Sequence, residues 1–191
     1  MQLRGRVLPA SLVVAIAAAC SDPVTSKKVR DVGDEKSGVA PGEYHRAGQP
    51  CAVCHHEGGE SKTVFSIAGT VFGQPGRTIG LDAAKVQMTD SAGAKYTATT
   101  NCVGNFYVKP SEFDPKFPVL VRVLKENRSR TMGSQIGRAA DCAECHKVGI
   151  APDSPEAFSS LTHVYLYSDD EAAPPKAAAC PVDPDLGIVK K

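Results

Sequence analysis

The chain is 191 residues long, 42% hydrophobic and only 6% aromatic, with a formal net charge of +1. A chain of this length and composition is expected to form one small domain with tails, built around one modest hydrophobic core. Because it has no basic stripe and no block of like charge, nucleic acid is excluded as a class of partner.

The first 19 residues are typical of a secretory signal peptide. Two arginines precede an apolar stretch that ends at Ala19 and is too short to span a bilayer in the mature protein. The three alanines before Cys20 resemble the lipobox of bacterial lipoproteins, with Ala17 where leucine is usual. This resemblance implies an exported lipoprotein that is anchored to a membrane through Cys20 and faces the periplasm or the cell exterior. Ordinary cleavage after Ala19, with Cys20 unmodified, is the alternative.

Residues 20–50 are polar, contain several prolines and show no apolar period, which predicts a flexible tether. Apolar and polar residues begin to alternate at position 64, the pattern of strands that bury one face. This alternation predicts strands over residues 64–71, 85–90, 94–100, 106–108 and 117–124. The Ser-Ala-Gly turn at 91–93 is expected to join two of them in a hairpin.

Beyond residue 125 the sequence is polar as far as Cys142. A short helix is then expected over 155–160, a final strand over 162–167 and an irregular, proline-rich tail over 169–191. Short strands at this spacing predict a mainly β fold. We expect a small β-sandwich domain over residues 51–168, flanked by two loop segments that carry paired cysteines.

Residues 65–124 contain a pattern of strand and turn residues shared with known small domains. The matching residues are Ala68-Gly69-Thr70-Val71, Val86, Asp90-Ser91-Ala92-Gly93 and Thr99-Thr100-Asn101-Cys102-Val103-Gly104-Asn105-Phe106-Tyr107. They resemble the transthyretin-like or carboxypeptidase-regulatory-like β-sandwiches of exported bacterial proteins. The resemblance covers about a third of the chain. It implies a scaffold or binding module, without any chemistry.

Two C-x-x-C-H motifs carry the chemistry of the sequence. They are Cys51-Ala52-Val53-Cys54-His55 and Cys142-Ala143-Glu144-Cys145-His146. Two thiols separated by two residues can add to the two vinyl groups of a haem, and the adjacent histidine then reaches the iron. We therefore expect two covalently bound c-type haems, with His55 and His146 as iron ligands. A zinc site built from both cysteine pairs is the main alternative, although zinc needs no histidine at a fixed next position.

Both motifs resemble those of multihaem c-type cytochromes, here with two haems. In such electron-transfer sites a second histidine or a methionine normally binds the iron opposite the first histidine. The candidates for this role are His45, His163 and Met132. Each has a simpler interpretation: a surface histidine, a partly buried histidine in a strand, and a loop methionine. His56 and Met88 are weaker candidates, since one adjoins a ligand and the other alternates within a predicted strand.

The cysteine count of seven is odd, which needs an explanation in an exported protein. Lipid at Cys20 and haem attachment at the two motifs account for five of them, and Cys102 and Cys180 remain. We predict a disulfide between these two, because such bonds persist in oxidising compartments. Two unpaired buried thiols are the alternative.

The sequence as a whole favours an electron carrier over an enzyme. The expected function is to pass single electrons between redox proteins at or outside the membrane, with both haem motifs at one end of the sandwich. A dihaem redox enzyme, such as a peroxidase or an oxyanion reductase, is the first alternative. The second is a subunit of a larger extracellular cytochrome assembly.

Overall fold

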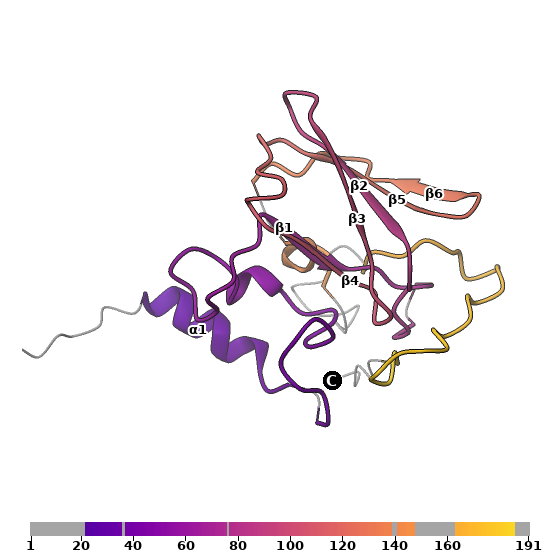
Figure 1. Ribbon diagram of the computed structural model, residues 1–191, viewed down its shortest axis with the longest axis horizontal. Coiled ribbons are helices and arrows are strands. Elements are labelled where there is room, and N and C mark those ends of the chain that lie inside the picture. The colour runs from indigo at the N-terminus through magenta and orange to yellow at the C-terminus, as the bar shows by residue number, and fades with distance from the viewer. Residues whose placement is uncertain (1–21, 36, 76, 139–140, 148–162, 186–191) are drawn as a thin grey trace, which may run out of the picture.

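The computed structural model describes residues 22–35, 37–75, 77–138, 141–147 and 163–185 (Figure 1). Within these ranges the strands are β1 (Ile67–Thr70), β2 (Lys85–Thr89), β3 (Lys95–Thr99), β4 (Asn105–Val108), β5 (Leu120–Lys125) and β6 (Arg128–Thr131). The helices are α1 (Pro23–Val32) and two short 3-10 helices, η1 (Cys51–Val53) and η2 (Cys142–Glu144). The protein is therefore mainly β, as predicted.

The strands form two antiparallel sheets, one in the order β3-β2-β5-β6 and the other of β1 and β4 (Figure 1). In the larger sheet Val86 of β2 lies between Ala98 of β3 and Val123 of β5. In the smaller sheet Gly69 of β1 pairs with Phe106 of β4. Apolar side chains of both sheets meet in one core, so the fold is the expected small β-sandwich.

The core follows from the alternation of the strands. In β2 the side chains of Val86 and Met88 are buried while Lys85 and Gln87 are exposed. In β5 Val121 and Val123 are likewise buried, while Leu120 and Arg122 are exposed. Period-two burial of this kind is the reason why the sequence predicts these strands so closely.

The structure differs from the prediction at two strands. β6 was not expected, because its four residues, Arg-Ser-Arg-Thr, are polar; it pairs with β5 at the edge of the sheet. The strand expected over 162–167 does not form within the described residues 163–167, where only Tyr165 makes an isolated bridge, to Phe72. The helix expected over 155–160 lies outside the described residues.

The segment expected to be a tether, residues 20–50, contains ordered structure. Asp22 caps α1 by accepting hydrogen bonds from the N–H groups of Val24 and Thr25, and the helix buries none of its residues. Further along, the Gly48 N–H donates to the Thr70 hydroxyl in β1 (2.7 Å). The end of this segment therefore belongs to the folded domain. No helix in the described ranges is both long and apolar enough to cross a membrane.

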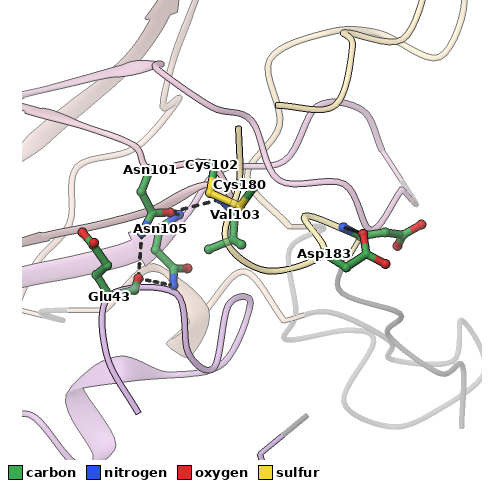
Figure 2. Close-up of a disulfide and its surroundings, with 8 residues drawn as sticks. Glu43, Asn101, Cys102, Val103, Asn105, Cys180 and Asp183 are labelled. Atoms are coloured by element: carbon green, nitrogen blue, oxygen red, sulfur yellow. Dashed lines mark hydrogen bonds between the residues drawn. A yellow bond between two sulfur atoms is a disulfide. The ribbon is translucent and has the colours of Figure 1, made fainter. Parts of the chain in front are cut away.

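The C-terminal tail is irregular in its described part, as expected, and is fixed to the sandwich. The Gln74 amide donates to the carbonyls of Ser168 (3.0 Å) and Glu171 (2.7 Å). A disulfide joins Cys180 of the tail to Cys102 in the turn before β4 (Figure 2). In the same turn Asn101 donates to the Glu43 carbonyl (2.7 Å), so the turn also contacts the segment before the first motif (Figure 2).

Non-reducing peptide mapping of the purified protein is expected to find Cys102 and Cys180 in one linked pair of peptides. The bond spans 78 residues. In the chain-entropy model a loop of that size contributes about 4 kcal/mol to stability. Cys180→Ser should therefore lower the unfolding midpoint clearly. Two free thiols at these positions would contradict the assignment.

Candidate haem-attachment sites

The two C-x-x-C-H motifs adopt the same local fold. In each, the first cysteine opens a 3-10 turn, and its carbonyl accepts from the N–H of the second cysteine and of the histidine. These distances are 3.2 and 3.0 Å to Cys51 and 3.3 and 2.8 Å to Cys142. The second cysteine then has nearly the same backbone angles, φ −106° and ψ −30° at Cys54 and φ −108° and ψ −38° at Cys145. One short turn therefore carries both thiols and the histidine in each motif. All four thiols are free of disulfides, as thioether formation requires.

His55 is held in the tautomer that a metal ligand needs. Its Nδ1 lies 2.9 Å from the Thr63 carbonyl, an acceptor, so Nδ1 carries the proton and donates it there. Nε2 is then left with its lone pair, the usual arrangement of a metal-binding histidine with an oriented ring. Burial lowers the pKa of His55, which also favours the neutral form.

A cavity of about 260 Å³ adjoins the first motif and is lined by Cys51, Cys54, His55 and His45. Aromatic and cationic side chains both contribute to its wall. These are Phe65, Phe106 and Tyr107, with Arg46 and Lys109. The volume is slightly below the range of roughly 300–1,000 Å³ of typical cofactor pockets.

His45 lies near His55, as a ligand for the opposite side of the same iron must. The two ring centroids are 5.9 Å apart and the ring planes differ by 20°. However, the Gly42 N–H donates to Nδ1 of His45 (2.8 Å), so the neutral ring carries its proton on Nε2. His45 can bind iron through Nε2 only after this hydrogen bond is given up. The position of His45 fits the predicted role, and its present tautomer does not.

A second cavity, of about 250 Å³, adjoins the second motif and is lined by two of the candidate iron ligands named from the sequence. Cys142, His146, His163 and Met132 line this cavity. Cys145 is exposed. Met132 and His163 thus line one cavity, although they come from segments 31 residues apart.

The two candidates opposite His146 differ in their surroundings. His163 is buried, packs on Phe72 (4.5 Å between ring centroids) and has Nε2 3.0 Å from the Gln74 carbonyl. Because that carbonyl is an acceptor, Nε2 is the protonated nitrogen, and the lone pair of His163 is on Nδ1. Met132 packs against the core, and its thioether has no proton to lose. Either side chain fits, and His163 could bind without rearrangement only through Nδ1.

The weaker candidates lie elsewhere. Nδ1 of His56 is 2.9 Å from the carbonyl of Ala52, so this ring folds back on its own motif. Met88 is completely buried in the sandwich core, as the alternation of β2 predicts.

The two motifs lie side by side, as expected. Asp141, directly before the second motif, accepts hydrogen bonds from the N–H of Ala52 (2.7 Å) and from the N–H of Ala143 (2.9 Å). β1 packs against both motifs, and a Cβ added at Gly69 in this strand would lie only 2.7 Å from Sγ of Cys142. This close approach requires a glycine. Phe106 lines both cavities and is buried, so it separates the two candidate haem sites.

Burial shifts the pKa values of the groups between the motifs. It raises the pKa of Asp141 to about 6, against the lowering effect of its two backbone hydrogen bonds. Burial, and then the neighbouring Asp141, raise the pKa of Cys142 to about 12 and that of Cys51 above its usual range. These thiols are therefore neutral in the folded chain. Sequence reasoning did not single out Asp141, although an aspartate before a helical turn is a typical capping residue.

Comparison with known proteins adds no relative. A scan against family models, a search of curated proteins and a search of solved structures each found no match to the chain. Among the described residues, no group of three or more His, Cys, Asp or Glu side chains is arranged to hold a bare metal ion.

Proposed function

We propose that this protein is a dihaem c-type cytochrome that transfers electrons. The observation that carries the proposal is the repeated attachment turn: two motifs of identical pattern fold alike, keep their thiols out of disulfides and adjoin separate cavities. Two C-x-x-C-H motifs that matched only by chance in sequence would not be expected to share the same hydrogen bonds and backbone angles. A haem supplies one-electron chemistry when bound, and the protein supplies attachment, orientation and surroundings.

In this proposal each residue has a defined task. Cys51 and Cys54 attach one haem, and Cys142 and Cys145 attach the other. His55 and His146 bind the irons, and the Thr63 carbonyl orients the ring of His55. His45 is the candidate for the opposite face of the first iron, while Met132 and His163 compete for the second.

Two features favour a carrier over a catalyst. The sites are adjacent, which suits stepwise transfer of electrons between them. Each cavity also holds a candidate for the sixth iron ligand, and a filled sixth position blocks substrate from the metal. A dihaem redox enzyme is the second candidate function, and a subunit of a larger cytochrome assembly the third. A bound lipid at Cys20 would place any of these at a membrane, facing the periplasm or the cell exterior, with redox proteins as partners.

The optical and EPR spectra of the purified chain, together with its intact mass, test the proposal. We expect a mass increase of two haems per chain and low-spin ferric iron at both. A high-spin component would favour the enzyme, because it indicates an open position on one iron. A chain without haem, or one that binds zinc instead, would contradict the proposal.

The distal ligands are tested by single alanine variants. His45→Ala should convert one of the two haems to high spin, and either Met132→Ala or His163→Ala, but not both, should do so to the other. A side chain that binds iron leaves the metal five-coordinate when removed, whereas a packing residue does not. His56→Ala is the matched control, because His56 adjoins the first motif but bonds back to Ala52. If His45→Ala, Met132→Ala and His163→Ala all keep the low-spin spectrum, these ligand assignments are wrong.

A further inference from the structure

Asp141 connects two parts of the chain that are distant in sequence. Its Oδ2 accepts from Ala52, 89 residues away, and its Oδ1 accepts from Ala143, two residues away. Both donors are the residues immediately after the first cysteine of a motif. One carboxylate thus holds both attachment turns at the same point of each turn.

The connection is buried and specific. Asp141 is only 3% exposed, so water does not compete for its oxygens. Hydrogen bonds from N–H groups to a carboxylate are stronger than those between neutral groups. An isolated bridge between Ala68 and Asp141 also joins the backbone of this residue to β1. The carboxylate therefore has a fixed position relative to the sandwich as well as to both turns.

We propose that Asp141 is a positioning residue that sets the distance and angle between the two haems. This inference rests on the proposed function, since it presumes haem at both motifs. A haem attached through two thioethers follows its 3-10 turn closely. Fixing both turns to one carboxylate consequently fixes the two rings relative to each other. Close and constant spacing is what stepwise electron transfer between the rings requires.

The obvious competing explanation is that Asp141 only stabilises the fold. Asp90 allows the two to be separated, because it has a similar structural role far from the motifs in sequence. Asp90 is 8% exposed, and its carboxylate accepts from the N–H groups of Ala92 (2.9 Å), Ala94 (2.8 Å) and Lys116 (3.1 Å). Asp90→Ala therefore removes a buried carboxylate with backbone partners and leaves the attachment turns unchanged.

Circular dichroism in the Soret region tests the proposal, because two haems held close together give a paired positive and negative signal that depends on their mutual angle. The experiment compares holo-protein of the native sequence with the variants Asp141→Ala, Asp141→Asn and Asp90→Ala, and the haem content of each is to be measured by mass. Asp141→Ala should retain two haems but lose at least half of the paired signal. Asp141→Asn keeps an oxygen acceptor for only one turn, so its loss should be intermediate. Asp90→Ala should lower the unfolding midpoint without changing the signal.

The outcomes separate this inference from the proposed function. A native chain without two haems refutes the proposed function. Two haems with no paired signal, or a signal unchanged in Asp141→Ala, overturn the role of Asp141 alone. Equal losses in Asp141→Ala and Asp90→Ala assign the effect to general destabilisation. If Asp141→Ala does not accumulate, Asp141→Asn decides: an unchanged signal in that variant overturns the proposal.

Discussion

Serine in place of Cys54 is expected to lower the yield of holo-protein several-fold and to leave the surviving first haem with a single thioether. The same result is expected for Cys145→Ser at the second motif. The reason is chemical: a hydroxyl does not replace the thiol in addition to a vinyl group, so one of the two covalent bonds cannot form. Each variant should leave the haem at the other motif in place, because the two cavities are separate.

Haem staining of denaturing gels and intact-mass analysis measure this effect directly. Cys102→Ser is the matched control, because it removes a cysteine that pairs with Cys180 and belongs to neither motif. It should change stability without lowering the number of haems per folded chain. If haem stain and mass are unaltered in either Cys54→Ser or Cys145→Ser, the assignment of two covalently bound haems is wrong.

The two central strands of the larger sheet, β2 and β5, were predictable because each carries its own signal. Val86 and Met88, and again Val121 and Val123, alternate with polar residues, and burial of one face follows from that pattern alone. β6 lacks this signal. Its Arg130 is exposed and stacks on Tyr165 (4.4 Å from the guanidinium carbon to the ring centroid), so the strand depends on partners that a local pattern cannot reveal.

In the candidate site, the residues with a local sequence pattern were likewise predictable, and the contacts between distant segments were not. The Cys and His residues of each C-x-x-C-H motif are adjacent in the sequence, which is why the attachment residues could be predicted from it. Convergence of Met132 and His163 on one cavity depends on how distant segments pack. Asp141 is the clearest example of a contact that the sequence does not reveal, because its hydrogen-bond partner Ala52 is 89 residues away. Within residues 163–167 the expected strand does not form, because alternation around Tyr165 does not guarantee a neighbouring strand to pair with.

Alanine in place of Cys20 is expected to move most of the protein from the membrane fraction to the soluble periplasm or the medium. Cys20 lies outside the described residues, so this prediction rests on its lipobox-like context. Lipid chains contribute about 0.8 kcal/mol per buried CH₂ group to membrane binding, and that contribution disappears with the thiol. No helix in the described ranges could replace it as a span.

Fractionation after a detergent-free wash, with mass analysis of the N-terminus, measures the release. The three alanines before position 20 retain the small residues that ordinary signal peptidase needs, so Cys20→Ala should still be processed. Ser21→Ala, which changes the neighbouring residue and keeps the thiol, should remain at the membrane and carry lipid. Processed Cys20→Ala protein that stays in the membrane fraction would contradict lipid anchoring and indicate a stable membrane partner instead.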